Sequence, residues 1–367
     1  MKDRIGFIAV GQAGGNIGVK LEQKGYKVLY INTSQEDLDT LGAAKFKHHI
    51  KNGEGCNKDR LKAKQALIDD FDEINRKIQE GIDTEFVYVI FSAGGGTGSG
   101  AGPMLADLLL GDIADGLSKT KNVGIITILP GIKEPVKTNI NAYECFTEIS
   151  SIEGVSSVFI IDNNAGDKIV LNHQFVNTLT AFLDIPSRHK SERGNIDKAE
   201  IIETLKAGGM IKIVQIPAKE SKTENIIEKF KTGMFAESEH DGIVKYITVS
   251  QAGSGFDIDV LQRETGMPVD VFSTYNEHST ICALSGLTYP VGRLERTYQA
   301  VYENKDKLIR SMNASTKIEM KDGINFLQSE ARGKAVSEVR QRVASNENSD
   351  SIQTRRVSRR ELLKKYM

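Results

Sequence analysis

The stretch Ser92-Ala93-Gly94-Gly95-Gly96-Thr97-Gly98-Ser99-Gly100 decides the fold of this chain. It follows the apolar run 86–91 and precedes the apolar run 103–110, so the pattern predicts a strand, a tight loop and the start of a helix. Five glycines among residues 94–100 leave the backbone uncovered, and consecutive N–H groups beside a helix N-terminus form a surface that suits phosphate. A structural turn is the alternative. The loop has no lysine and the chain has no G-x-x-x-x-G-K-[S/T] run, which excludes the common P-loop.

Length and composition bound the class of protein. The chain has 367 residues, enough for two ordinary domains, with 26% charged residues and a formal net charge of −1. Cys56, Cys145 and Cys282 lie far apart without C-x-x-C spacing, which argues against disulfides and a zinc site and favours a reducing cytosol. The sequence opens directly on a strand pattern, so we expect no signal peptide. No apolar run approaches the roughly 20 residues of a membrane helix, so we expect no integral membrane association.

Further loops follow strands in the same way. The apolar strand 5–10 leads into Gly11-Gln12-Ala13-Gly14-Gly15-Asn16 and a helix, the order in which nucleotide-binding folds open. The strand 28–31 ends at Asn32, which also suits a plain turn. The loop 53–57 precedes a long helix whose expected apolar positions are Leu61, Leu67, Ile68, Phe71, Ile74 and Ile78. The strand 123–129 precedes a P-x-x-x-E loop that ends at Glu134.

The string Gly94 to Gly100 resembles the signature of the tubulin/FtsZ family of polymerising GTPases. By the order of motifs, the resemblance covers about residues 5–300. It implies GTP or GDP as the ligand, with Mg²⁺ and with no metal site built from protein side chains alone. Position 138, where FtsZ proteins have arginine, is Thr138 here, with Lys137 beside it. The residues that the resemblance places around the nucleotide are Gly11, Gln12, Ala13, Gly14, Gly15, Asn16, Asn32, Gly53, Gly55, Asn57, Ala93, Gly94, Gly95, Gly96, Thr97, Gly98, Ser99 and Glu134. For Glu134 it implies a ribose contact or an interface contact.

A base pocket is expected after the predicted strand 155–161. Asn163 follows this strand, and His173 and Asn177 share one face of the next helix because they are four residues apart. The resemblance implies that Asn163 and Asn177 hydrogen-bond guanine, since an amide offers a donor and an acceptor. It also implies that His173 stacks on the base, where the family has an aromatic residue. A histidine on a helix is otherwise a plain surface or core residue.

The motif 194–200 carries the second part of the resemblance. Its Asn195, Asp197 and Glu200 form the pattern N-x-D-x-x-E, where FtsZ-like proteins have N-x-D-x-x-D. Spacing alone favours a helix capping box at Asp197 and Glu200. The resemblance instead implies that one subunit supplies these side chains to the nucleotide site of the next, where a carboxylate orients or deprotonates the attacking water.

The predicted fold is α/β, with a mostly parallel Rossmann-like sheet followed by a smaller α+β domain with a mixed sheet and by C-terminal helices. We expect a nucleotide-binding domain at 1–170, a central helix and loop at 171–194, and a C-terminal activation domain at 195–300. C-terminal helices are expected at 301–345, with a basic tail at 346–367 that is richest in cations over 355–365. Such a charge run is a solvated face or a contact for an adaptor, polymer, DNA or anionic membrane.

Within the family, the chain is most similar to the TubZ type, which moves plasmid or phage DNA. The short length, the missing arginine, Glu200 and the basic tail support this comparison. It implies a polymerisation-coupled GTPase that forms head-to-tail filaments in the bacterial cytoplasm. It also implies a small DNA-binding adaptor on a centromere-like site, in a plasmid- or phage-encoded system. The alternatives are an FtsZ-like division polymer, a nucleotide-bound scaffold without turnover, and a dinucleotide-dependent Rossmann enzyme, which would favour an acid at position 32.

Overall fold

A single sheet runs through the protein in the computed structural model, which describes residues 1–51, 53–239 and 242–316. In chain order the elements are β1 (Ile5–Val10), α1 (Gly11–Gln23), β2 (Lys27–Asn32), α2 (Gln35–Asp39), β3 (Lys47–His49), α3 (Arg60–Gly81), β4 (Phe86–Ser92), α4 (Thr97–Ala114), β5 (Asn122–Leu129), α5 (Val136–Ser150), β6 (Val158–Asp162), the 3-10 turn η1 (Asn163–Ala165), α6 (Lys168–Leu183), α7 (Ile185–Arg188), α8 (Lys198–Leu205), β7 (Met210–Pro217), η2 (Ala218–Glu220), α9 (Thr223–Thr232), β8 (Tyr246–Ala252), α10 (Ile258–Thr265), β9 (Asp270–Asn276), β10 (Ser279–Leu287) and α11 (Val291–Thr316).

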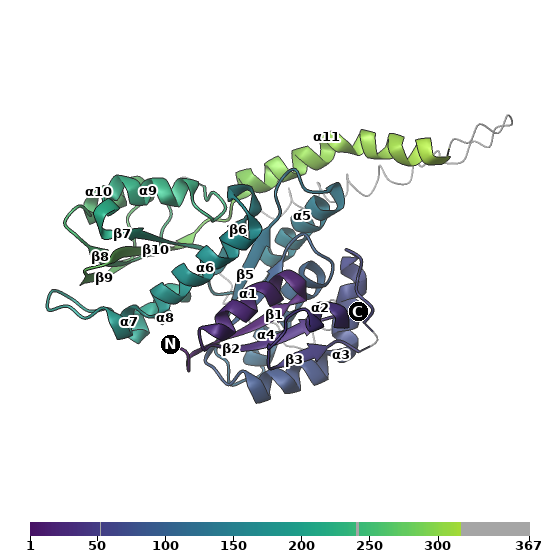
Figure 1. Ribbon diagram of the computed structural model, residues 1–367, viewed down its shortest axis with the longest axis horizontal. Coiled ribbons are helices and arrows are strands. Elements are labelled where there is room, and N and C mark those ends of the chain that lie inside the picture. Colours follow the sequence, from purple (N-terminus) through teal and green to yellow (C-terminus); the bar gives the residue numbers. More distant parts are fainter. Residues whose placement is uncertain (52, 240–241, 317–367) are drawn as a thin grey trace, which may run out of the picture. The chain divides into compact units, whose positions relative to one another are not determined.

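The first part of the sheet is parallel throughout. Its strand order is β3-β2-β1-β4-β5-β6, and every neighbouring pair in it runs in the same direction. α1 packs beside α6, whereas α4 packs between α3 and α5, so helices cover both faces (Figure 1). This arrangement confirms the predicted α/β class. It also brings the loops that follow β1, β2 and β4 to one edge, where the carboxyl ends of parallel strands meet.

The second part of the sheet is mixed, as predicted. β7 joins β6 in parallel through a single residue pair, Val158 with Met210. β10 then pairs antiparallel with both β7 and β8, and β9 pairs parallel with β8. The mixed strands therefore extend the first sheet instead of forming a separate one, with ten strands in the described residues.

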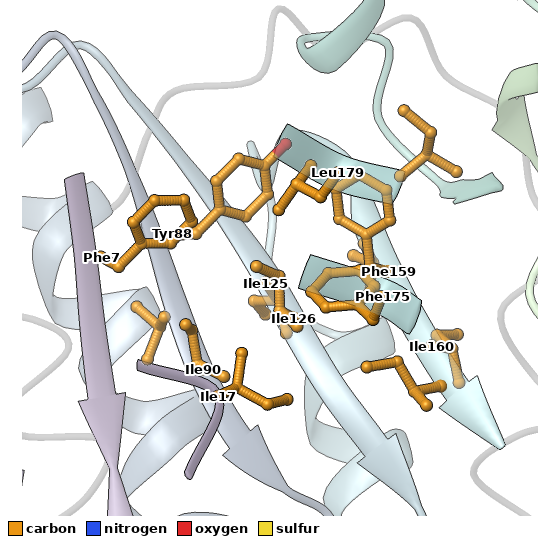
Figure 2. Close-up of a cluster of buried hydrophobic side chains, with 14 of the residues drawn as sticks. Phe7, Ile17, Tyr88, Ile90, Ile125, Ile126, Phe159, Ile160, Phe175 and Leu179 are labelled. Carbon is orange, nitrogen blue, oxygen red and sulfur yellow. The ribbon is translucent and has the colours of Figure 1, made fainter. Parts of the chain in front are cut away.

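A row of aromatic side chains forms the centre of the core (Figure 2). The ring of Tyr88 lies 6.1 Å from that of Phe7 and 5.7 Å from that of Phe159, which in turn lies 5.5 Å from Phe175 of α6. The hydroxyl of Tyr88 and that of Ser157 lie 2.7 Å apart in a hydrogen bond, so the buried phenol is satisfied. Because β1, β4 and β5 are covered on both faces, they appear in the sequence as continuous apolar runs.

Several boundaries differ from the predictions. α4 begins inside the glycine string, at Thr97, and ends at Ala114, with Pro103 within it. β6 begins at Val158, so 155–157 precede the strand. Leu61, expected on the apolar face of α3, is 77% exposed, whereas Arg60 and Ala63 of the same turn are buried, so Leu61 lies on the solvent side of the helix. The short elements α2 and β3 were not predicted.

A buried arginine fixes the start of α11. The guanidinium of Arg293 donates to both carboxylate oxygens of Asp162, at 2.7 and 3.1 Å, and to the carbonyl oxygen of Pro130 at 2.8 Å. It also donates to the hydroxyl of Thr297 one turn along. Arg293 is 3% exposed and Asp162 7%, so an interior ion pair holds the first turn of α11 against the ends of β5 and β6.

Met1–Val301 form one compact unit, and the part of α11 from Tyr302 belongs to a second unit. The helices expected beyond residue 316 and the basic tail lie outside the described residues. Among the residues that the structure describes, no helix is long and apolar enough to cross a membrane.

Candidate nucleotide site

Two helices begin side by side at the carboxyl ends of β1 and β4. α1 begins at Gly11 and α4 at Thr97, and their strands are paired in parallel (Figure 1). Gly11 has a φ of 73°, and an added Cβ would lie 3.1 Å from the backbone nitrogen of Gly98, so the first turns of the two helices nearly touch. Both N-terminal ends carry unsatisfied N–H groups and partial positive charge.

A cavity of about 380 Å³ lies over these helix ends. Four segments supply its described lining: the loop after β1, the start of α2, the loop before α3 and the glycine string. The structure therefore brings together the three loops that were predicted to hold phosphates. The predicted residues that line the cavity are Gly11, Gln12, Ala13, Gly55, Asn57, Gly95, Gly96, Thr97 and Gly98.

Other predicted glycines and small residues are packing positions. A Cβ on Gly14 would lie 2.4 Å from the carbonyl oxygen of Ile90, so glycine at this position lets α1 lie directly on β4. Above Gly95, by contrast, the nearest atom to an added Cβ is 3.9 Å away. The buried hydroxyl of Ser99 donates to the carbonyl oxygen of Gly95 at 2.6 Å and so shapes the loop. The predicted phosphate-loop residues absent from the described cavity lining are Gly14, Gly15, Asn16, Gly53, Ala93, Gly94 and Ser99.

Two side chains that shape the cavity, those of Thr33 and Asn141, were not predicted from the sequence. The hydroxyl of Thr33 lies 2.6 Å from that of Thr97, and it is also 3.3 Å from the Sγ of Cys56. From α5, the amide of Asn141 donates to the carbonyl oxygens of Gly95 at 2.7 Å and Lys58 at 3.0 Å. These contacts tie the loops after β2 and before α3 to the glycine string.

Asn32 is committed to a local turn. Its side-chain oxygen accepts from the backbone N–H of Ser34 at 3.2 Å, and its side-chain nitrogen donates to Asp37 at 3.1 Å. The residue is 2% exposed. The hydrogen bond from Asn32 therefore helps to place the carboxylate of Asp37 at the cavity.

The predicted base-binding residues lie in η1, where Asn163 stands, and along α6, where His173 and Asn177 lie in the second and third turns. His173 and Asn177 are both exposed, one turn apart. The ammonium of Lys20 on α1 lies 2.8 Å from the Nε2 of His173, in a hydrogen bond that links the two helices. Beside them a second cavity, of about 720 Å³, is lined by α1, the loop 40–45 and the start of α6, with Asn16 and Asn172 among its walls.

Glu134 and Asn163, both predicted at the nucleotide, lie in direct contact. One carboxylate oxygen of Glu134 accepts from the amide of Asn163 at 3.3 Å, the backbone N–H of Gly131 at 3.1 Å and the ammonium of Lys168 at 3.0 Å. Burial raises the pKa of Glu134, but the Lys168 ammonium and the two N–H donors outweigh it, so the pKa lies below its usual range. Glu134 is therefore a charged acceptor at neutral pH.

Asn195, Asp197 and Glu200 lie at the opposite edge of the sheet. α6 leads from the cavity edge to α7 and α8, which Figure 1 shows near the chain's N-terminus. The electrostatics agree with this placement of α8. The pKa of the Met1 amino group is lowered mainly by burial and next by the positive charge of Lys198 on α8. Within one chain, the structure does not bring these side chains to the glycine loops.

The N-x-D-x-x-E motif forms a complete capping box. Oδ1 of Asp197 accepts from the backbone N–H groups of Ala199 and Glu200, and Oε2 of Glu200 accepts from that of Asp197. The oxygen of Asn195 accepts from the N–H of Ser191 at 2.9 Å. The capping interpretation is thus confirmed, and the box uses Oδ1 of Asp197 and Oε2 of Glu200 and does not use Oδ2 or Oε1.

Glycine-lined loops over paired helix N-termini, at the carboxyl edge of a parallel sheet, define an α/β protein with a phosphate-binding site. Residues 4–170 match the Tubulin/FtsZ family, GTPase domain. The chain thus carries a GTPase domain of the Tubulin/FtsZ family, as the sequence predicted.

The relatives support the same assignment over more of the chain. The tubulin-like protein TubZ of a Clostridium botulinum C phage is 28% identical over 323 residues, which are 86% of this chain and 87% of the relative. The crystal structure of Clostridium botulinum phage c-st TubZ has a TM-score of 0.74 and 25% identity, and covers 84% of this chain and 100% of its own. The GDP-form protofilaments of Bacillus thuringiensis serovar israelensis TubZ share the fold, with a TM-score of 0.67, 17% identity, and coverage of 89% and 94%.

Proposed function

We propose that this protein binds GTP, hydrolyses it to GDP and phosphate, and assembles head to tail so that each nucleotide site is completed by the next subunit. One observation carries the proposal. The glycine-lined cavity and the carboxylates of Asp197 and Glu200 lie at opposite edges of one sheet. A heterologous contact between such edges repeats along a filament and places the two parts of the site together. The GDP-form protofilaments of Bacillus thuringiensis serovar israelensis TubZ are consistent with this kind of assembly.

The loops divide the nucleotide between them in this proposal. The phosphates lie over the residues that line the cavity, where backbone N–H groups and helix dipoles favour negative charge. Asn163, His173 and Asn177 hold the guanine, Glu134 contacts the ribose or the subunit interface, and Asn32 lies beside the nucleotide. The parts are a nucleotide-binding domain at 1–170, a central helix and loop at 171–194, and an activation domain at 195–300.

Mg²⁺ fits this cavity as a companion of the phosphates. Among the described residues no group of three or more His, Cys, Asp and Glu side chains could hold a metal ion. Mg²⁺ in nucleotide sites takes most of its ligands from phosphates and water, with one or two carboxylates. Asp37 and the hydroxyl of Thr97 line the cavity and suffice for that role. The ion would neutralise charge on the phosphates.

The hydrolytic step depends on the capping box. Asp197 and Glu200 each keep one carboxylate oxygen outside the box, while the box itself fixes their rotamers. Held in this way at a neighbour's cavity, the outer oxygens orient the water that attacks the terminal phosphoryl group. Positioning supplies most of the catalysis in phosphoryl transfer. Asn195 orders the turn before the box.

The cellular role that we propose is partition of plasmid or phage DNA in the bacterial cytoplasm. It is supported by the similarity to a phage protein named TubZ. The filament would carry DNA through a small DNA-binding adaptor bound to a centromere-like site. The basic tail at 355–365 offers six cations for a further contact.

The test uses variants that keep the fold. Asn is a good N-cap and Gln serves in a capping box, so Asp197→Asn and Glu200→Gln retain the structural role and remove the charge. Phosphate release from GTP and from ATP, and sedimentation, are measured as protein concentration rises. We expect turnover with GTP to appear above a threshold together with pelleting, and to be lost in both variants while pelleting persists. Turnover proportional to protein at every concentration, without pelleting, would refute a shared site.

The dinucleotide alternative is tested in parallel. Tight binding of NAD(P) in place of GTP would support a Rossmann enzyme. The structure gives this alternative little support, because the residue at the end of β2 is Asn32 and not the acidic residue that would bind the ribose.

A further inference from the structure

The loop that leads to the N-x-D-x-x-E motif is held at its first residue by a buried hydrogen bond. This loop, 189–197, joins α7 to α8 and begins at His189. The Nδ1 of His189 lies 2.6 Å from the hydroxyl oxygen of Ser250 on β8, which is fully buried. Farther along, the hydroxyl of Thr274 on β9 donates to the carbonyl oxygen of Gly194 at 2.8 Å. Two strands of the mixed part of the sheet therefore fix the course of the loop.

The polarity of the buried hydrogen bond follows from Asn276. Its side-chain oxygen accepts from the backbone N–H groups of His278 and Ser279, at 2.8 and 3.1 Å, so its amide nitrogen faces the other way. That nitrogen donates to the hydroxyl oxygen of Ser250 at 2.9 Å. Within the described ranges the hydroxyl has one further partner, the Nδ1 of His189, so its own proton goes there. His189 is therefore an acceptor at Nδ1 and carries its proton on Nε2.

The surroundings of His189 favour the same neutral form. The pKa of its imidazole lies below the ordinary value, first because of burial and then because of repulsion from protonated His278 and from Arg188. Asp184 acts in the opposite direction, but it is paired with Arg188 at 3.0 Å. Protonation would turn Nδ1 into a donor, and the buried hydroxyl of Ser250 would then lose the acceptor of its proton. A charged His189 is thus incompatible with the bond that holds the loop.

We propose that His189 is a positioning residue for the hydrolytic step. Its hydrogen bond to Ser250 sets the course of the loop 189–197 and so places the carboxylates of the capping box at the neighbour's nucleotide. This inference rests on the proposed function. As the pH falls through the pKa of His189, the bond is lost and turnover falls with it. The nucleotide cavity lies at the other edge of the sheet, so nucleotide binding persists.

The test measures phosphate release per pelleted subunit of the full chain at saturating GTP, from about pH 5 to 8. In the unmodified chain we expect turnover to fall in acid by about tenfold per pH unit below the pKa of His189. His189→Asn presents an oxygen near the position of Nδ1 and does not titrate, so we expect turnover close to normal at neutral pH and an acid loss shifted to lower pH. For His189→Leu we expect turnover to be lower by about tenfold or more at every pH, with pelleting retained. His278→Asn is the matched control, an exposed histidine of the same surroundings, and should retain the acid loss.

Nucleotide binding separates this inference from the proposed function. Methylanthraniloyl-GTPγS is titrated at protein concentrations below assembly, and we expect each variant to bind it within about twofold of the unmodified chain, since the site is distant. Normal turnover in His189→Leu, or an acid loss at the same pH in His189→Asn as in the unmodified chain, would overturn the assignment and leave the proposed function in place. If the unmodified chain neither bound this nucleotide nor pelleted, the proposed function itself would fail, and this inference with it.

Discussion

Replacing Arg293 by methionine is expected to destabilise the protein strongly. The substitution keeps much of the side chain's volume but removes the partner of Asp162, whose side chain is 10% exposed. Removing one member of a buried pair leaves an uncompensated charge and costs about 3–5 kcal/mol. Asp162 retains one acceptor contact, with the N–H of Asn164 at 2.9 Å, which does not replace the guanidinium.

The loss is large enough to measure by thermal unfolding. For a cooperative unit of about 300 residues, 3–5 kcal/mol lowers the unfolding midpoint by about 5–8 °C. Far-ultraviolet circular dichroism is the suitable signal, since the chain contains no tryptophan. Arg296→Met is the matched control: this arginine lies on the same helix, and its ion pair with Glu237 is about half exposed on both sides. Such surface pairs contribute about 0–1 kcal/mol.

The double variant Arg293→Met with Asp162→Asn tests the cause. Asn keeps an oxygen for the turn after β6 and removes the buried charge, so we expect the double variant to unfold at a higher temperature than Arg293→Met alone. If Arg293→Met and Arg296→Met unfold at the same temperature, the interior ion pair does not hold the start of α11 in place and the reasoning fails.

Three further outcomes follow from the structure. Gly14→Ala should lower the unfolding midpoint, because its Cβ would meet the carbonyl oxygen of Ile90 at 2.4 Å and overpacking costs about 1–3 kcal/mol, whereas Gly95→Ala should leave the midpoint unchanged and weaken nucleotide binding. His173→Phe should retain GTP affinity and His173→Ala should lose about tenfold in the same titration, since base stacking contributes about 1–3 kcal/mol; equal affinities would exclude stacking. Burial lowers the pKa of Lys212 to about 8 from its ordinary value, so stability should rise between about pH 8 and 10.5 by roughly 3 kcal/mol, and urea unfolding of Lys212→Met should lack this rise.

The sequence predicted those parts of the fold whose causes are local. β1, β4 and β5 could be located because strands buried on both faces need long apolar runs. β3 could not, since Lys47–His49 has no apolar pattern and exists only through pairing with β2. Nor could the junction of β6 with β7, because one residue pair joins the two parts of the sheet.

The candidate site was predictable to the same degree. The glycine string stands out because helix N-termini and close backbone contacts need that residue type. Lys58, Thr33 and Asn141 did not stand out, because they are ordinary residues whose partners lie as far as 83 positions away. The spacing of Asp197 and Glu200 favours a capping box, whereas the resemblance implies a catalytic pair, and the structure establishes the capping box.

The contrast between Gly14 and Gly95 bears on how such chains diverge. Position 14 is closed by the carbonyl oxygen of Ile90, whereas position 95 opens onto the cavity. A descendant that had lost the proposed nucleotide turnover would still be selected, for folding alone, to keep glycine at 14. Position 95 would be free to drift. In such a lineage, loss of the proposed GTPase activity would first allow substitutions at position 95. The rest of the glycine pattern would be retained because the fold requires it.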